Sequence, residues 1–491
     1  MDGSTIALFM ILSAPLIAAV LLIALSGRAK ARFWAGPIAT VGALTSLIAV
    51  FALLPALYSG ETPTFSVAWM PMAGIALRLR MDWLALPFTL VEAAVTLIAV
   101  IYALGYHHTD ERSPFFYALL LLFQVGMSGT TLADDTFLFY VFWELMLIAS
   151  CLLIIVWGDG EQRGAVAFKY FVFTHLGSLL VLVGLIVLYN AAGTADLAVL
   201  RQGVTLAPAM VNTIIALFVI GFSVKMAVFP LHLWLPDAHT VAPMPVTIML
   251  AAAMLSMGTY GILRFPMSFF GLEAIRPFAL PMMIGGVISE IYGAMMALAE
   301  RDIKRIVAYS SVSQMGYILM GLGTLNRQGL IGATLHVIYH GIVKALLFMC
   351  VGLVIQATGR RRIDELGGLG KSMPLAAVCT AIGALTIAGA PPFCVFDSEW
   401  MIFTGAFATE YLWLAMATLF GSLLTVVYAL WLFGQLFLGR LPEGLRTERV
   451  SRWMSWSTVF LAALALIEGL VPAPVFDWVS RQLPLLFGGV W

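Results

Sequence analysis

The chain has 491 residues, of which 62% are hydrophobic and only 11% are charged, with as many acidic as basic side chains. A soluble domain carries about 25% charged residues, so this composition excludes an ordinary soluble enzyme and predicts a membrane protein. The zero formal net charge gives no reason to expect a nucleic-acid partner. The 4 cysteines are scattered in apolar segments without a CxxC pair, so we expect no metal site and no cofactor.

Long apolar runs recur along the whole chain, and runs of about 18 or more apolar residues are typical of membrane helices. We therefore expect an all-α polytopic fold with about 14 transmembrane helices. These helices are predicted near residues 5–26, 33–57, 84–105, 114–132, 136–157, 165–190, 209–230, 244–265, 278–299, 303–323, 330–357, 373–410, 412–437 and 456–474. The first run has no basic region before it, which favours a retained helix over a cleaved signal peptide.

Two of these helices are expected to be broken, because prolines interrupt them at Phe229-Pro230 and at Pro391-Pro392. A weak internal repeat precedes each break: residues 163–180 resemble residues 328–347, with His175 and His340 in register. Paired broken helices in two halves are typical of transporters that carry ions near the middle of the membrane.

Basic residues gather in alternate loops, at 28–32, 301–305, 360–362 and 440–452. Cytoplasmic loops carry the excess of Lys and Arg, so these loops are predicted to be cytoplasmic. Both termini are then expected outside, in the inner or cell membrane of a bacterium or archaeon.

Glu144 and Lys225 stand in the first half of the chain, in stretches that are otherwise apolar. A charge at membrane depth costs roughly 3 kcal/mol, so such residues usually serve a function and have partners. We expect Glu144 and Lys225 to pair and to exchange a proton; a structural hydrogen bond and a snorkelling lysine are the alternatives. Lys169 and His175 form a weaker line of the same kind.

His336, His340 and Lys344 are spaced by four residues, so they line one face of a single helix. Histidine titrates near neutral pH, and this face is predicted to be a proton relay. Hydrogen bonds between helices are the alternative, and a zinc site is conceivable although no further ligand is near in sequence.

Glu399 begins the second half of the second broken helix, where it could end a proton path or cap the half-helix. Glu290 is a further acidic candidate in an apolar segment, as are Glu92 and Glu468. Asp237 and His239 follow the first break and could admit protons, although a simple turn explains them equally well.

Four stretches together resemble the antiporter-like subunits of respiratory complex I, Mrp-type cation/proton antiporters and energy-converting membrane hydrogenases. They read FWELMLIAS, VKMAVFPLHLWLPDAHTVAP, ALAERDIKRIVAYSSVSQMGY and HVIYHGIVKALLF. The resemblance is greatest for M-type subunits, and it implies a proton channel in two inverted five-helix halves joined by a polar axis. A single transmembrane domain is then expected over 1–491, with N-terminal helices 1–110, half-channels 111–270 and 271–440, and a C-terminal helix in 441–491.

The resemblance implies that Glu144 and Lys225 are the glutamate–lysine pair of the first half and that Glu399 is the terminal group of the second. Ser256 stands where this family carries a central lysine, and Gln314 stands where relatives often have histidine. Lys344 matches a lysine of another branch of the family. We therefore expect Lys344, with His340 and His336, to supply the central protonatable group.

These features predict a non-redox, proton-translocating subunit of a multi-subunit respiratory complex, of the NADH:quinone oxidoreductase or membrane hydrogenase type. Its expected partners are other membrane subunits, protons and the lipid bilayer, and a quinone bound at an interface with a partner stays open. One alternative is a subunit of an Mrp-type Na⁺/H⁺ antiporter, with Na⁺ as the coupling ion. Another is a structural membrane scaffold that does not pump.

Overall fold

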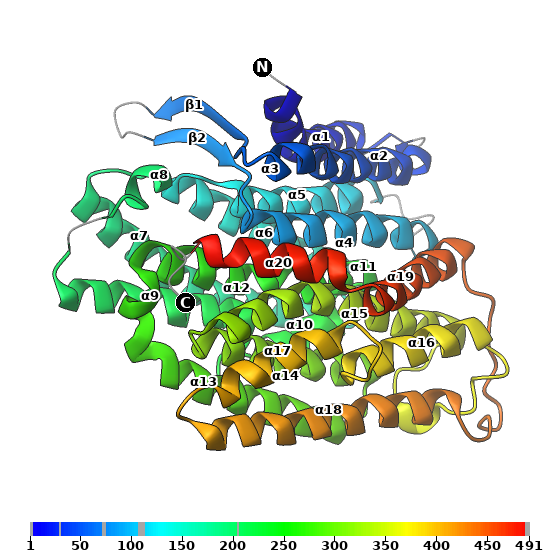
Figure 1. Ribbon diagram of the computed structural model, residues 1–491. Helices are drawn as coiled ribbons and strands as arrows, with labels where there is room; N and C mark the ends of the chain where they lie inside the picture. Colours follow the sequence, from blue (N-terminus) through cyan, green and yellow to red (C-terminus); the bar gives the residue numbers. More distant parts are fainter. Residues whose placement is uncertain (1–2, 29–30, 71–74, 107–112, 204–205, 487–491) are drawn as a thin grey trace. The chain divides into compact units, whose positions relative to one another are not determined.

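A computed structural model describes residues 3–28, 31–70, 75–106, 113–203 and 206–486 (Figure 1). Most of these residues are helical, as the apolar runs predict. The helices are α1 Gly3–Leu25, α2 Ala31–Ala52, α3 Leu54–Tyr58, α4 Ala85–Tyr106, α5 Ser113–Leu132, α6 Thr136–Trp157, α7 Arg163–Ala192, α8 Leu197–Leu200, α9 Pro208–Met226, α10 Leu235–Val241, α11 Met244–Met249, α12 Ser256–Ile262, α13 Ser268–Ala299, α14 Ile303–Gly323, α15 Arg327–Thr358, α16 Pro374–Ile387, α17 Val395–Phe407, α18 Leu412–Phe437, α19 Arg452–Leu470 and α20 Ala473–Leu486.

The predicted fold class is confirmed, because every expected membrane helix falls on helical residues. Among the described residues, 11 helices are long and apolar enough to cross a membrane, judged by length and composition. The count of fourteen spans and the inverted repeat stay predictions. The loop expected at 58–83 holds an unforeseen hairpin of strands β1 Thr64–Met70 and β2 Ile75–Arg80, which are antiparallel with Thr64 opposite Arg80.

The contacts divide the chain into two compact units, which are described separately. Unit 1 comprises residues 1–101, 107–225 and 256–276, and unit 2 comprises residues 102–106, 226–255 and 277–491. The division into two half-channels at residue 270 stays a prediction.

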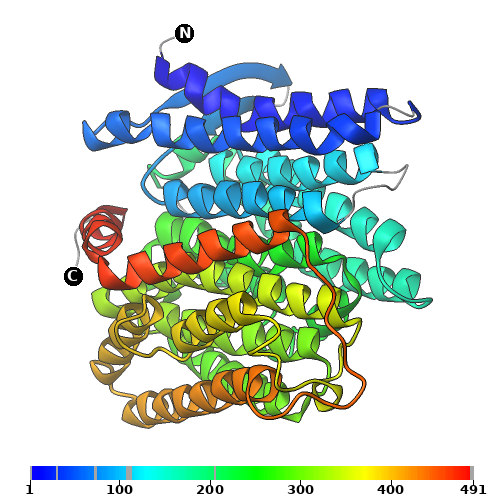
Figure 2. The same ribbon diagram turned by 90° about the vertical axis from the view of Figure 1, so that its right-hand side faces the viewer.

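In unit 1, α5 is buried along its length and packs against α1, α2 and α6 (Figures 1 and 2). Glycines allow this close approach: a Cβ atom at Gly126 would lie 2.5 Å from the backbone nitrogen of Met146 in α6. Small residues at helix contacts are typical of membrane bundles, where close packing replaces the hydrophobic effect.

In unit 2, α15 is the central helix, and α14, α16, α17 and α19 pack around it. It is buried from Gly329 to Val354, so its polar side chains are surrounded by protein. A Cβ atom at Gly405 of α17 would lie 2.5 Å from the backbone nitrogen of Gly329, which shows how closely the two helices approach.

Both predicted helix breaks are present. The first separates α9 from α10, and Ala227 has a φ of 55° in it. The second separates α16 from α17, and Gly389 has a φ of 61°. Each break leaves backbone groups without helical partners, which membrane proteins tolerate only inside protein or beside water.

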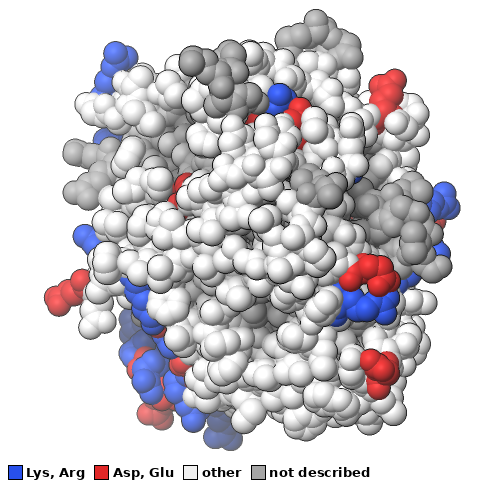
Figure 3. Space-filling model, turned by 90° about the vertical axis from the view of Figure 1, so that its left-hand side faces the viewer, with Lys and Arg blue, Asp and Glu red and all other residues white. Residues whose placement is uncertain are grey.

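The surface carries many apolar side chains. Along α18 they recur with helical spacing: Leu412, Trp413, Met416, Phe420, Leu423 and Val427 are all exposed. On the face drawn in Figure 3, charged residues form small separate groups on an otherwise uncharged surface. Exposed apolar stripes of this length indicate contact with lipid or with partner subunits.

Candidate functional site

In unit 1, Glu144 is positioned by the start of α6. Asp135 caps this helix, because its carboxylate accepts hydrogen bonds from the backbone nitrogens of Phe137 and Leu138 at 3.0 and 3.2 Å. Arg78 of β2 donates to the same carboxylate at 3.0 Å. The hairpin that the sequence did not reveal therefore helps to fix the helix that carries Glu144.

The basic side chain that contacts Glu144 is His175 of α7, whose Nδ1 lies 3.1 Å from the carboxylate. The neighbouring Trp143 donates its indole hydrogen to Ser178 at 2.9 Å, one turn beyond His175. This second bond fixes the register of α6 and α7 and so keeps Glu144 opposite His175. The sequence predicted both ionisable residues but not that they touch.

Lys225 lies at the end of α9 and is 1% exposed. Its Nζ is 5.2 Å from the centre of the Trp143 ring, and Glu144 is the acidic group whose charge acts on it. No hydrogen bond or ion pair joins Nζ to another group in the described part of the chain. The expected pair is thus electrostatically coupled without direct contact, and Glu144 stands between two basic side chains.

Two glycines bring α9 against α7. A Cβ atom at Gly177 would lie 2.7 Å from the Cβ of Val224, and one at Gly221 would lie 2.7 Å from the carbonyl oxygen of Gly177. Gly221 is one turn before Lys225. This contact therefore determines how close Lys225 comes to the Glu144–His175 pair.

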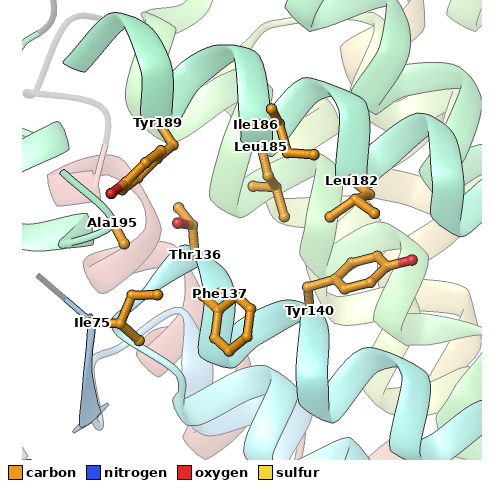
Figure 4. A pocket seen from close by; sticks show the side chains of 9 residues that line it. All are labelled: Ile75, Thr136, Phe137, Tyr140, Leu182, Leu185, Ile186, Tyr189 and Ala195. Atoms are coloured by element: carbon orange, nitrogen blue, oxygen red, sulfur yellow. The ribbon is translucent and has the colours of Figure 1, made fainter. Parts of the chain in front are cut away.

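A pocket of about 250 Å³ opens between α6 and α7 in unit 1 (Figure 4). Its lining is mostly apolar and consists of Ile75, Thr136, Phe137, Tyr140, Leu182, Leu185, Ile186, Tyr189 and Ala195. Tyr140 is one turn before Glu144, so the pocket lies on the side of α6 that carries the carboxylate.

Lys169, which the sequence grouped with His175, is half-buried in the first third of α7.

In unit 2, His336, His340 and Lys344 lie on one face of α15 and are completely buried. Lys344 donates to the Ser310 hydroxyl and lies 3.5 Å from the Val307 carbonyl oxygen, both in α14. The ring of His340 is 6.4 Å from that of His336, and neither of its nitrogens has a hydrogen-bond partner within the described ranges.

His336 joins this line to two other helices. Its Nε2 lies 2.9 Å from the Oε1 of Gln314 in α14, and its Nδ1 lies 3.0 Å from the Ser398 hydroxyl in α17. Ser398 immediately precedes Glu399. The line of Lys344, His340 and His336 therefore ends at Ser398, the residue before Glu399 in α17, and Gln314 forms part of it.

Glu399 is buried, accepts a hydrogen bond from Ser422 of α18 at 3.4 Å, and packs against Gly389, where a side chain would collide with its carboxylate. It borders a pocket of about 360 Å³. Other residues around this pocket are Leu385, Ala388, Ala390, Phe396, Trp400, Phe403, Leu419, Val426 and Leu430. An acidic group at the edge of a pocket can exchange protons with whatever water enters it.

Glu290 of α13 is also completely buried in unit 2, with the Tyr317 hydroxyl of α14 as its hydrogen-bonding neighbour. Its carboxylate lies directly over Gly421 of α18, one residue from Ser422, the partner of Glu399. Glu290 and Glu399 thus contact adjacent positions of α18, which places two acidic groups in one region.

The residues after the first break have different surroundings. Asp237 pairs with Arg305 of α14 at 2.6 Å and is partly exposed. His239 is buried against the ring of Phe348, with 5.4 Å between ring centres, and its nitrogens have no hydrogen-bond partner among the described residues. Asp237 therefore stabilises the turn through an ion pair, while His239 belongs to the buried polar interior of unit 2.

Ionisable side chains thus lie in a row in each unit: Lys225, Glu144 and His175 in unit 1, and Lys344, His340 and His336 in unit 2. The described residues contain no group of three or more His, Cys, Asp or Glu side chains arranged to hold a metal ion. Sequence reasoning missed Trp143, Ser178, Ser310 and Ser398, whose only signal was a polar or aromatic residue near a charged one. Such lines can bind and pass protons, because each member titrates or hydrogen-bonds.

Comparison with known proteins places this chain in a family. The family model described as "NADH:quinone oxidoreductase/Mrp antiporter, TM" matches residues 133–425. NADH-quinone oxidoreductase subunit M of Rhodobacter capsulatus is 32% identical over 467 residues, which cover 90% of this chain and 89% of the relative. F(420)H(2) dehydrogenase subunit M of Methanosarcina mazei is 32% identical over 428 residues, covering 85% of each chain.

Solved structures share the fold. A chain of the Mrp complex from Dietzia sp. has a TM-score of 0.90 at 23% identity and covers 100% of this chain and 98% of its own length. A chain of respiratory complex I from Thermus thermophilus has a TM-score of 0.86 at 25% identity. The match covers 98% of this chain and 100% of the Thermus chain. The present chain therefore belongs to the NADH:quinone oxidoreductase/Mrp antiporter family of membrane subunits.

Proposed function

We propose that this chain is the proton-translocating, M-type antiporter-like subunit of a multi-subunit respiratory membrane complex. The observation that carries the proposal is the row of Lys344, His340 and His336 on one buried face of α15, whose last member hydrogen-bonds Ser398, the residue before Glu399, inside unit 2. Several buried ionisable groups on one line are expensive to keep in a membrane unless they serve an ion path.

Unit 1 contributes a switch to this proposal. Glu144 can neutralise either His175 or Lys225, since it contacts the first and acts electrostatically on the second. A Glu144 carboxylate held by His175 stabilises a positive charge on Lys225 less than one that is turned toward Lys225. A shift of Glu144 between its two partners would therefore move one proton.

The energy would come from partner subunits, through changes of charge or conformation at their interface. Relatives named as subunits of NADH-quinone oxidoreductase and F(420)H(2) dehydrogenase support a respiratory complex. The family description also includes Mrp antiporters, so a Na⁺/H⁺ antiporter subunit is the second candidate. A quinone at a partner interface and an outside location of both termini are further parts of this proposal.

The two candidate functions can be distinguished by purifying the intact complex from its native membrane and identifying the other subunits. Redox subunits favour the first candidate, and small antiporter subunits favour the second. Proton uptake by proteoliposomes that requires a sodium gradient and no electron donor would contradict the respiratory assignment.

The proton path is tested with Lys225→Ala, Lys344→Ala and His340→Ala in the reconstituted complex, with Lys371→Ala at an exposed loop position as the matched control. We expect each buried variant to lower proton translocation by at least about tenfold, because each removes one group from a line, while Lys371→Ala changes nothing. If Lys225→Ala abolishes translocation and Lys344→Ala leaves it intact, Lys344 is not the central group. If all three variants pump normally, the chain is a scaffold.

A further inference from the structure

A third polar line lies in unit 1, between α4 and α5, away from Glu144 and Lys225. At its centre is Glu92, which is 0% exposed and accepts a hydrogen bond from the Ser128 hydroxyl at 2.5 Å. Its second oxygen has no hydrogen-bond partner within the described residues, and no basic residue of that part of the chain forms an ion pair with it. Glu92 also lies outside the segment 133–425 that the family model matches.

Polar side chains continue from Glu92 toward the end of the unit where α4 begins. Thr89 and Thr131 place their hydroxyl oxygens 2.8 Å apart, one turn from Glu92 and Ser128 respectively. The hydroxyl of Tyr260 donates to the carbonyl oxygen of Thr131 at 2.6 Å. Side chains of three helices of unit 1, α4, α5 and α12, thus meet in one polar cluster.

An ion pair ends the cluster. The Nε of Arg264 donates to the Tyr260 hydroxyl at 2.9 Å, and both terminal nitrogens of Arg264 donate to Asp82 at 2.7 Å. Burial would raise the pKa of Asp82, but the charge and hydrogen bonds of Arg264 hold it well below its usual range. Asp82 is therefore ionised, and the cluster ends in a neutralised charge pair in the loop before α4.

In the opposite direction the line continues to Gln124, which lies one turn before Ser128. The side-chain amide nitrogen of Gln124 donates to the hydroxyl of Ser46 in α2 at 3.1 Å. The oxygen of Gln124 and the hydroxyl of Thr96, one turn beyond Glu92, have no partner among the described residues. Buried polar atoms of this kind are usually hydrogen-bonded by ordered water, which would connect the side chains further.

The charge state of Glu92 follows from its surroundings. An ionised carboxylate in an apolar interior needs a counter-charge, and one hydroxyl partner does not supply it. The carboxyl group therefore carries a proton. A structural hydrogen bond between α4 and α5 would need no acid, because Ser, Thr or Gln would form it at a lower desolvation cost.

We propose that Glu92 is a proton-binding site that exchanges its proton through the hydroxyl groups of Ser128, Thr131 and Thr89, and ordered water between them, with solvent at the Asp82 end of unit 1. It uses none of the residues of the Glu144–Lys225 pair or of the α15 line, so it does not depend on the function proposed above. Its ligand is a proton alone, because a single carboxyl group with hydroxyl neighbours offers no cage for a metal cation.

Infrared spectroscopy of the reconstituted complex tests this site. The C=O stretching band of a protonated carboxyl group is recorded before and after transfer to D₂O, and Glu92→Gln identifies the band by removing it. We expect the band to move to lower frequency as deuterium replaces the proton. Thr131→Val should slow this exchange about tenfold, the effect of losing one hydrogen bond.

The matched control is Thr130→Val, which removes a neighbouring buried hydroxyl that bonds only the backbone of its own helix at Gly126. In this variant the carboxyl proton of Glu92 should exchange at the rate found in the unaltered chain. Ser128→Ala is a second variant, in which the band should persist at higher frequency because the carboxyl group loses its partner. Three results would each overturn the proposal. The first is a Glu92 band that never shifts in D₂O, and the second is the absence of any band that Glu92→Gln removes. The third is an equal exchange rate in Thr131→Val and Thr130→Val.

Discussion

At the scale of single residues, several buried ionisable side chains of this chain are held only by neutral partners. Lys344 has a serine and a carbonyl, Glu399 has a serine, and Glu92 has a serine. Arg264 and Asp82 are the contrast, because they form a complete bidentate ion pair. A weakly partnered charge can change protonation state, whereas a fully paired one is structural.

Asp82→Asn should therefore destabilise the protein, because it leaves Arg264 buried without a counter-charge. We expect a loss of about 3 kcal/mol, measured by chemical or thermal unfolding of the purified complex. The pKa of Asp82 in the folded protein lies below its ordinary value of 3.8, so the pair contributes fully above that value. The difference in free energy of unfolding between Asp82→Asn and the unaltered chain should then be constant from about pH 7 to 5 and shrink only in stronger acid. A difference that disappears near neutral pH would contradict this assignment.

Gly421→Ala should displace the carboxylate of Glu290, which occupies the space of the new methyl group. Because the obstacle is the end of a flexible side chain, we expect a stability change of about 1 kcal/mol or less but reduced proton translocation. Gly434→Ala in the same helix is the control, since nothing lies within 4 Å of its Cβ position. Equal translocation in the two variants would exclude Glu290 from the path.

At the scale of elements, close helix contacts place the charged groups. Gly177 and Gly221 bring α7 and α9 together, and the Trp143–Ser178 bond fixes α6 against α7. Spacing by four correctly predicted the common face of His336, His340 and Lys344, because residues on one helix share its geometry. The partners of this face, Gln314 and Ser398, come from other helices, and no local pattern indicates such a meeting.

Gly177→Ala should separate α7 from α9, because its new methyl group would meet Val224 next to Lys225. We expect about 1–3 kcal/mol of destabilisation and a several-fold lower rate of proton translocation. Gly164→Ala in the same helix has open space around its Cβ position and should be neutral or slightly stabilising. Unchanged transport in Gly177→Ala would show that the position of Lys225 does not depend on this contact.

At the scale of the whole molecule, the uneven distribution of basic residues predicts how the chain is oriented in the membrane. Ser26→Cys and Ser59→Cys add exposed thiols to loops at opposite ends of α2, and the four native cysteines are buried. A membrane-impermeant maleimide applied to intact cells should label Ser59→Cys and not Ser26→Cys. The reverse pattern would invert the predicted orientation.

Local hydrophobicity and the positions of proline were enough to predict the class of protein, the helices and their two breaks. They also singled out Glu92, Glu290, Glu399 and Lys344, which are buried, because a charge inside an apolar run is visible without a structure. Asp82, Asp135 and Arg264 are buried as well and were not predicted. The contacts of the ionisable residues follow from the packing of the helices: His175 contacts Glu144, Lys225 lies beside Trp143, and Glu92 receives its hydrogen bond from Ser128. Contacts between side chains of distant segments depend on how each helix is rotated and on the small residues that permit close approach. The local sequence pattern predicts neither.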